Sequence, residues 1–325
     1  MDTNKTVLIT GCAGFIGTNL TKSLLDLSFN VIGIDNLFSG KIENIELFSN
    51  NPKYKFIKHD IIEPFNLDIM NTFIHSNISE IYHLAMPASP LFYQSEPIKT
   101  IETGVIGTIN ILKLAVLLKS KILFTSTSEI YGDPEISPQT ESYRGNVNTV
   151  GIRACYDESK RIGETLIYEY KRKYNIDAKI VRIFNTYGPY MSIDDGRVIT
   201  NFIKCILEDS PLEIYGDGSQ TRSFCYIDDM IIGLIKMMNS NKSGPINLGN
   251  PNTEFTIISL VKIFEKILEK DLKIDYKPLP SDDPKQRRPD ISKAILYLGW
   301  NPKTNIYDGI YNTFKYFIDL KKSNE

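Results

Sequence analysis

The amino-acid sequence predicts an α/β protein: a Rossmann-type, doubly wound parallel sheet with a smaller C-terminal substrate-binding α/β domain. Through the first half of the chain, short apolar runs alternate with longer amphipathic stretches. That alternation is typical of parallel strands joined by covering helices. The first apolar run leads directly into the glycine-rich sequence GCAGFIG at residues 11–17, a pattern typical of dinucleotide-binding turns. After residue 189 the elements become shorter and more mixed, which indicates a second region.

The individual elements follow in order from these runs. Strands are expected at residues 7–10, 31–35, 55–59, 81–85, 121–126 and 179–184. Helices are expected at residues 15–27, 98–119, 156–174 and 306–320, where the apolar residues recur at helical spacing. Residues 277–289 are rich in proline and charge and predict a surface loop or substrate lid. We expect a dinucleotide-binding domain over residues 1–185 and a mainly substrate-binding domain over residues 186–325, with a soft and interleaved boundary.

Composition excludes several classes of function. The chain has 325 residues, of which 42% are hydrophobic and 23% charged, as in ordinary globular proteins. Lys and Arg number 37 against 39 Asp and Glu, a balance that argues against nucleic acid or an anionic membrane as partner. The four cysteines lack paired or zinc-type spacing, which indicates a reduced, cytoplasmic protein without a metal site. No signal peptide and no apolar run of membrane-spanning length are apparent in the sequence.

Three glycines at the start of the chain, Gly11, Gly14 and Gly17, indicate a cofactor site. They permit a tight turn, close approach of a pyrophosphate and close packing of helix on strand, while the helix N-terminus favours negative charge. The next predicted strand ends in Asp35. Its carboxylate would bind ribose hydroxyls and repel a 2′-phosphate, so NAD is predicted rather than NADP. The simpler alternative is a structural turn beside an unrelated acidic strand end.

A candidate catalytic pair follows in the segment RACYDESK at residues 153–160. Tyr156 and Lys160 lie four residues apart, hence on one face of a predicted helix. A nearby cation lowers the pKa of a phenol and lets it exchange a proton at neutral pH. Two such residues also occur on solvated helix faces, but TSTSE at residues 125–129 ends a predicted strand, where parallel sheets bind ligands. A hydroxyl from this segment could share a substrate hydroxyl with Tyr156.

Further segments carry a family resemblance: DNLFSGK at 35–41, HLAMPASP at 83–90, STSEIYGDP at 126–134, RIFNTYGP at 182–189, DGRV at 195–198, YGDGSQTR at 215–222 and DDPKQRRPD at 282–290. With GCAGFIG and RACYDESK, they resemble the extended short-chain dehydrogenase/reductase family of nucleotide-sugar enzymes. More narrowly, they resemble the UDP-glucuronate decarboxylase (UDP-xylose synthase) family. The resemblance covers nearly the whole chain, from residue 6 to about residue 317.

The resemblance implies NAD-dependent conversion of UDP-glucuronate to UDP-xylose and CO2. C4 of the sugar would be oxidised, the resulting 4-keto acid would lose CO2, and C4 would be reduced again. Tyr156 would take the proton at C4, Lys160 would tune it, and Arg287 would approach the sugar carboxylate or act as an acid at C5. The high pKa of arginine makes that acid role hard to sustain. The catalytic residues implied are Tyr156, Lys160, Thr127, Ser128, Glu129 and Arg287.

Binding residues are implied in the same way. The NAD contacts expected are Gly11, Gly14, Phe15, Ile16, Gly17, Asp35, Asn36, Phe38, Ser39, Gly40, Asp60, Ile61, Leu84, Thr100, Tyr156, Lys160 and Thr186. The UDP-sugar contacts expected are Lys99, Tyr93, Asn185, Arg197, Tyr215, Gln220, Arg222 and Arg287. We also expect a homodimer with a four-helix interface, formed by the helices at 98–119 and 156–174.

Two positions depart from the family pattern. Gly104 stands where the family usually has an asparagine that orders active-site waters, so proton relay is expected to differ. Met86 stands where serine is usual, a mild change if the backbone makes the cofactor contact. Neither departure touches Tyr156, Lys160 or Glu129.

Other functions remain as alternatives on the same fold. A 4-epimerase normally lacks an acid at position 129, and a 4,6-dehydratase usually carries Asp-Glu where this chain has Ser128-Glu129. An oxidative decarboxylase would release the UDP-4-keto-pentose and NADH, and shares the Ser-Glu pair and the arginine. From a different class, a non-catalytic NAD-binding sensor would be expected to lose Tyr156, Lys160 or Thr127, and all three are present.

Overall fold

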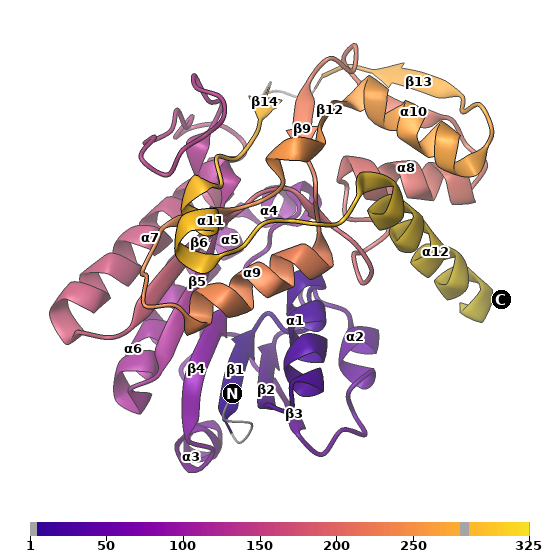
Figure 1. Ribbon diagram of the computed structural model, residues 1–325. Helices are drawn as coiled ribbons and strands as arrows, with labels where there is room; N and C mark the ends of the chain where they lie inside the picture. The colour runs from indigo at the N-terminus through magenta and orange to yellow at the C-terminus, as the bar shows by residue number, and fades with distance from the viewer. Residues whose placement is uncertain (1–4, 280–285, 325) are drawn as a thin grey trace.

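Seven parallel strands form the central layer of the molecule (Figure 1). The computed structural model describes residues 5–279 and 286–324. The strands lie in the order β11-β6-β5-β4-β1-β2-β3, and every neighbouring pair is parallel. Their bounds are β1 Thr6–Thr10, β2 Asn30–Asp35, β3 Tyr54–Lys58, β4 Ile78–His83, β5 Lys121–Thr127, β6 Ala178–Ile183 and β11 Ile246–Leu248. The predicted fold class is confirmed.

Helices cover both faces of this sheet because the strands are apolar on both faces. In β1, Val7 and Ile9 belong to one core cluster and Leu8 to the other, as the two-residue period of a strand requires. The helices over the Val7 face are α1 Phe15–Asp26, α2 Ile42–Glu46 and α9 Ile227–Asn239. Those over the Leu8 face are α3 Leu67–His75, α6 Thr108–Leu118 and α7 Ala154–Tyr174.

The expected helix at 98–119 is one continuous rod in three parts. α5 Pro97–Glu102 passes through a π-helical turn at Thr103–Gly107 into α6, and α4 Pro90–Ser95 precedes it. Within the described residues, the rod Pro97–Leu118 alone is long and apolar enough to cross a membrane. The prediction that no apolar run reaches that length was therefore wrong. The rod packs against α7 and β4, and a core helix passes the same length and composition test.

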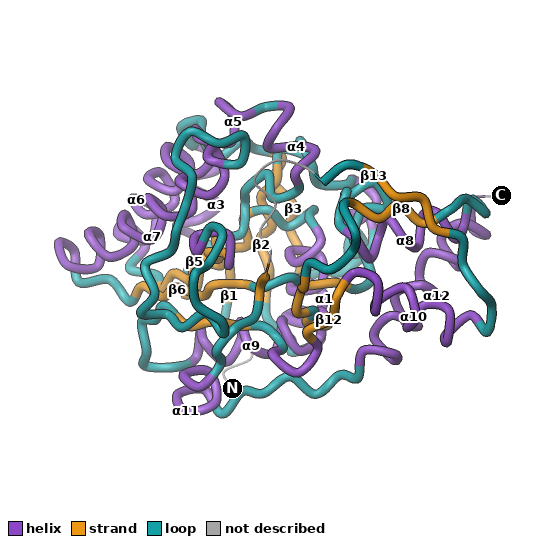
Figure 2. The backbone as a smooth tube through the Cα atoms, turned by 90° about the horizontal axis from the view of Figure 1, so that it is seen from above, coloured by secondary structure: helices purple, strands orange, loops and turns teal. Residues whose placement is uncertain are grey.

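The second half of the chain forms smaller layers beside the sheet, as the view from above shows (Figure 2). β7 Thr186–Tyr187 pairs with β10 Cys225–Tyr226, and β8 Leu212–Tyr215 pairs with β13 Ile274–Lys277. β9 Thr221–Ser223 lies between β12 Glu254–Thr256 and β14 Gln286–Arg287. The remaining helices are α8 Val198–Leu207, α10 Ile257–Leu268, α11 Ser292–Leu298 and α12 Ile306–Asn324, with 3-10 turns at Ser128–Tyr131 and Pro251–Thr253.

Two elements of the second half belong to the first layer. β11 pairs with β6 and completes the edge of the large sheet, and α9 packs against β5, β6 and α1. The boundary near residue 185 stays a prediction, since the chain crosses between layers after it. The lid expected at 277–289 lies partly outside the described residues, at 280–285. Its described end is β14, where Arg287 is 1% exposed and so is no surface lid residue.

Candidate active site

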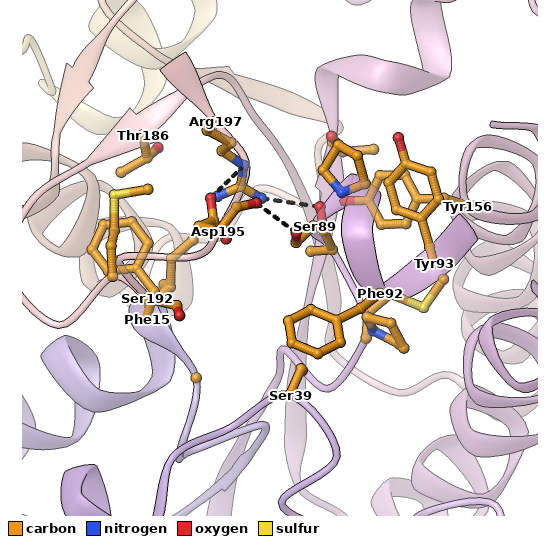
Figure 3. A pocket seen from close by; sticks show the side chains of 18 of the residues that line it. Phe15, Ser39, Ser89, Phe92, Tyr93, Tyr156, Thr186, Ser192, Asp195 and Arg197 are labelled. Carbon is orange, nitrogen blue, oxygen red and sulfur yellow. Dashed lines mark hydrogen bonds and ion pairs between the residues drawn. The ribbon is translucent and has the colours of Figure 1, made fainter. Parts of the chain in front are cut away.

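A cavity of about 600 Å³ opens along the carboxyl ends of the parallel strands. Its lining comes from the first layer and, across from it, from residues of β8, β9 and β14. In folds of this kind ligands bind beyond the carboxyl ends of the strands. Figure 3 shows the cleft with Tyr93 and Tyr156 side by side and Arg197 facing them across it.

The glycine-rich turn builds one end of the cavity from backbone. Gly11 has φ +75°, a left-handed conformation that favours glycine, and a Cβ at Gly17 would lie 2.0 Å from the carbonyl oxygen of Gly11. Gly14 caps α1 without a side-chain hydrogen bond, so the first-turn N–H groups remain available to an anion. Asp35 at the end of β2 accepts hydrogen bonds from the N–H groups of Ala13 (3.0 Å) and Leu37 (2.8 Å). This donor set and shape fit the diphosphate and ribose of NAD.

The other predicted cofactor residues lie along the same cavity, with one exception. Its lining includes Phe15, Ile16, Asn36, Phe38, Ser39, Gly40, Asp60, Ile61, Leu84 and Thr186. Thr100 is fully buried, and its hydroxyl donates to the carbonyl of Glu96 at 2.9 Å. It does not line the cavity, whereas Thr103 does. The structure therefore does not support Thr100 as a direct contact, because its side chain points into the helix packing.

Tyr156 and Lys160 both line the cavity from α7. The ring of Tyr156 stacks on Tyr93, with centroids 5.2 Å apart. Lys160 donates from Nζ to the carbonyl of Thr125 at 2.6 Å and lies over the ring of Phe124. The strand end at residues 125–129 and the helix face of Tyr156 and Lys160 therefore meet in the cavity, as predicted.

The electrostatics of this pair differ from the expectation. Burial raises the pKa of the Tyr156 phenol to about 12, although a hydrogen bond with the Thr127 side chain and the charge of Arg197 oppose the rise. Burial also lowers the pKa of Lys160 to about 7. The predicted lowering of the Tyr156 pKa by Lys160 is thus not what the structure shows, since Lys160 is itself desolvated and directed at a backbone carbonyl.

A charged cluster stands at the sugar end of the cavity. Glu129, in the turn after β5, forms ion pairs with Arg153 and with Arg287, whose Nη2 lies 3.2 Å from Glu129 Oε2. Arg287 also donates to the carbonyl of Ser128. Burial alone would raise the pKa of Glu129, but the charges of Arg287 and Arg153 outweigh it and lower that pKa to about 2. Glu129 is therefore a carboxylate at neutral pH.

The remaining predicted substrate residues line the same cavity. Arg197 donates to the carbonyl of Ala88 at 3.0 Å and approaches Asp195, whose carbonyl accepts from Ser89 at 2.6 Å (Figure 3). Lys99 forms an ion pair with Asp60 at 3.1 Å, which joins a predicted substrate contact to a predicted cofactor contact. The others that line the cavity are Tyr93, Asn185, Tyr215, Gln220 and Arg222.

The two departures from the family pattern are neighbours. A Cβ at Gly104 would lie 2.6 Å from Cβ of Ser159 and 3.2 Å from the terminal methyl of Met86. A larger residue at position 104 would therefore collide with side chains from α7 and from the loop after β4. Gly104 and Met86, which are separate departures in the sequence, therefore pack together beside Ser159.

Sequence reasoning missed Arg153 and Asp157 as site residues. Arg153 holds Glu129 from the N-terminus of α7, three residues before Tyr156. Asp157 is 6% exposed, next in sequence to Tyr156. Both residues lie inside the segment RACYDESK, so their place in that motif was the signal. Only the fold shows that Arg153 contacts Glu129 and that Asp157 lines a cavity together with Glu129.

A glycine-rich diphosphate cradle, a Tyr-Lys pair and a cleft shared by two layers define an NAD-dependent short-chain dehydrogenase/reductase of the nucleotide-sugar type. The family model "GDP-mannose 4,6 dehydratase" matches residues 8–313. The chain is 48% identical over 308 residues to UDP-glucuronic acid decarboxylase 6 of Arabidopsis thaliana, covering 94% of this chain and 87% of the relative. It is 44% identical to UDP-glucuronic acid decarboxylase 1 of Danio rerio, covering 96% of this chain and 72% of the relative. The chain belongs to the GDP-mannose 4,6 dehydratase family, in the branch that holds the UDP-glucuronic acid decarboxylases.

Solved structures agree with this placement. UDP-glucuronic acid 4-epimerase from Bacillus cereus, in complex with UDP-glucuronic acid and NAD, matches with a TM-score of 0.86 and 30% identity, covering 97% of this chain and 99% of that one. UDP-glucose 4-epimerase from Thermotoga maritima, with UDP-glucose, matches with a TM-score of 0.88 and 28% identity, covering 98% of this chain and 100% of that one.

Proposed function

We propose that this protein decarboxylates UDP-glucuronate to UDP-xylose and CO2 with NAD. The observation that carries the proposal is Glu129, clamped by Arg153 and Arg287 in the same cleft as Tyr156 and Lys160. The curated relatives at 44–48% identity are UDP-glucuronic acid decarboxylases, which favours this reaction over the epimerase, dehydratase, oxidative and sensor alternatives.

When bound, NAD supplies reversible hydride acceptance at C4 of the sugar. Tyr156 holds the proton of the C4 hydroxyl, and Thr127, its hydrogen-bond partner, orients that hydroxyl. Lys160, held by the Thr125 carbonyl, lines the site on the same helix as Tyr156. The glycine turn and Asp35 hold the diphosphate and adenosine ribose of the cofactor.

Once C4 is a ketone, the C6 carboxylate belongs to a β-keto acid. The C5–C6 bond breaks, its electron pair becomes an enolate delocalised onto O4, and CO2 leaves as a neutral molecule. A new C5–H bond then forms with a proton that comes ultimately from water. The guanidinium of Arg287 keeps its proton under all ordinary conditions, so we assign it to holding carboxylate and enolate charge rather than to protonating C5.

The nucleotide-sugar contacts are proposed in the same cleft. Arg222 and Arg197 would contact the UDP diphosphate, because guanidinium groups suit bidentate recognition of phosphate. Tyr93 covers the ring of Tyr156 and would contact the sugar. The further contacts proposed are Lys99, Asn185, Tyr215 and Gln220, all in the lining.

A homodimer is proposed through the α5–α6 rod and α7. Exposed apolar side chains on these helices support it, namely Ile98, Ile101, Ile106, Leu117 and Ile162. Two such helix pairs meeting across a two-fold axis would make the four-helix interface. A cytoplasmic location also stays a proposal, supported by four cysteines that are all free thiols.

The test uses purified protein with UDP-glucuronate and NAD, with products followed by proton NMR and NADH by absorbance. UDP-xylose without net NADH is expected. NADH accumulating with a 4-keto pentose would favour the oxidative decarboxylase. Tyr156→Phe should lower turnover by about 10²–10⁴-fold with NAD still bound, whereas Tyr174→Phe, on an exposed ring of the same helix, should change nothing. Full turnover in Tyr156→Phe would remove Tyr156 from the mechanism.

A further inference from the structure

A second cavity lies behind the charged cluster. Its volume is about 180 Å³, and it is lined by Glu129, Gly132, Asp133, Asn146, Val147, Asn148, Gly151, Arg153 and Asp157. Glu129 and Arg153 line both this rear cavity and the main cleft. Their ion pair is therefore the wall between the two. The rim residues Asp133, Asn146 and Asn148 are exposed, so the rear cavity reaches solvent on a side away from the cofactor.

One wall of the rear cavity carries the buried side chain of Asp157. Asp157 is 6% exposed, and its Oδ1 has no hydrogen-bond partner within the part of the chain that the structure describes. A buried carboxylate oxygen without a hydrogen-bond partner is costly unless the group is protonated or reached by water. The lining of the cavity includes carboxylate, guanidinium and amide groups, and the cavity has room for roughly six water molecules.

The proposed reaction consumes one proton per turnover. UDP-glucuronate enters with its carboxylate ionised, and CO2 leaves neutral, so the proton that C5 gains must come from outside the substrate. The proton moved at C4 by Tyr156 returns in the reduction and cannot serve. A bound nucleotide sugar would occupy the main cleft, which the Glu129–Arg153 ion pair separates from the rear cavity.

We propose that the rear cavity is the proton-entry compartment of this enzyme, and that Asp157 holds the proton that passes Glu129 to the carbon that loses CO2. The inference rests on the proposed function. The O–H bond of Asp157 breaks, a C5–H bond forms on the enolate through Glu129 or a water it holds, and water in the rear cavity returns the proton to Asp157. Asp157 acts through Glu129 and does not touch the sugar, so it is a positioning residue.

The charges around Glu129 and Asp157 fit these two different roles in proton transfer. Glu129 is held ionised by its arginines and stores a proton poorly. Burial and the charge of Glu129 raise the pKa of Asp157 to about 7, so it can both store and release one near neutral pH. The charged and titratable groups that face Asp157 from the elements packed on it are Glu129, Arg153, Arg287, Glu158, Tyr93, Tyr156 and Asp133.

The test is Asp157→Asn in the full-length protein, with Glu158→Gln as the matched control on the same helix. UDP-xylose formation should fall at least tenfold, while NADH formation in the first turnover should change less than twofold. The enolate that is not protonated in the site should leave it, take a proton from bulk water and appear as 4-keto pentose, with NADH accumulating in equal amount. A solvent deuterium isotope effect should grow in the variant, and the loss of wild-type rate as pH rises through about 7 should vanish.

A second variant guards against misfolding. Val147→Phe fills the rear cavity while Asp157 stays in place, and it should shift the products toward the 4-keto pentose in the same way. Equal slowing of NADH and UDP-xylose formation, with unchanged isotope effect and pH profile, would overturn the proposal, since a structural role predicts that result. If the wild type makes no UDP-xylose, the proposed function itself fails, and the proton-entry role falls with it.

Discussion

The two ends of the cleft are built in different ways. The cofactor end is mostly backbone: a glycine turn and the N-terminus of α1, all within one short stretch of chain. The sugar end is side chains, where Glu129 meets Arg153 and Arg287 from distant parts of the sequence. Backbone sites tolerate change at most side chains but not at a few glycines. In a site built from side chains, each buried charge needs a partner of opposite charge.

The largest difference between the two ends is expected from Arg287→Met, a change at the sugar end. Removing the guanidinium leaves Arg153 as the ion-pair partner of Glu129 and removes the group assigned to the sugar carboxylate. Turnover should fall by about 10²–10³-fold, as for loss of one charge-stabilising donor, while NAD affinity should change little. UDP-xylose formation by NMR and NAD titration by fluorescence check both halves. Weakened NAD binding in this variant would show that the two ends are not separate.

The converse variant is Gly17→Ala, a single methyl at the cofactor end. Its Cβ would lie 2.0 Å from the carbonyl oxygen of Gly11 and 2.8 Å from Cα of Cys12, both backbone atoms that cannot yield cheaply. NAD affinity should fall by at least tenfold, and stability by roughly 1–3 kcal/mol. The control is Gly196→Ala, since a Cβ at Gly196 meets nothing within 4 Å, although its φ of +78° adds some strain. Equal NAD affinity in Gly17→Ala and wild type would contradict the cradle.

A smaller effect is expected where the two ends meet, at Gly104. Gly104→Ala should cost about 1–3 kcal/mol of folding free energy, because its Cβ would collide with Cβ of Ser159, an atom that cannot rotate away. Ser159→Gly in the same chain should recover most of that loss beyond its own helix cost of about 1 kcal/mol. Thermal unfolding of the four variants in this cycle measures the coupling. Simple additivity would show that Gly104 and Ser159 do not share the space.

The weakest effect expected is a pH dependence at the rear of the sugar end. The folded-state pKa of Asp157 is raised from 3.8 to about 7, so its stabilising contribution is full below about pH 3.8 and is lost as pH rises through about 7. Asp157→Asn removes that loss. The melting temperature of the variant relative to wild type should therefore rise between about pH 5 and about pH 8. A constant difference across that range would mean that Asp157 titrates normally.

Sequence patterns predicted the first layer well because its signals are local. The expected strands were confirmed within a few residues, and the glycine turn, Asp35 and the Tyr156–Lys160 spacing are all readable in short segments. The family resemblance implied Thr100 as an NAD contact, but Thr100 is fully buried and Thr103, one turn further on, lines the cavity.

Long-range features were not readable in the same way. β11 has three residues and no pattern of its own, and only its pairing with β6 makes it part of the large sheet. Arg287 belongs to a segment that was expected to be a surface loop or substrate lid, yet it is buried against Ser128 and Glu129. The only signal for Asp157 was its place in RACYDESK, because the cavity that it lines is formed largely by a loop that precedes it in the chain.

The late arrival of β11 has a consequence for biosynthesis. When the chain emerging from the ribosome has just passed β6, that strand is the open edge of a growing sheet, and it stays open until residues 246–248 follow. At ordinary translation speeds the interval is on the order of seconds, long compared with strand pairing. During it, β6 presents unpaired backbone groups to any neighbouring nascent chain. Slowing translation after residue 183 should therefore increase aggregation of this protein more than slowing it after residue 248.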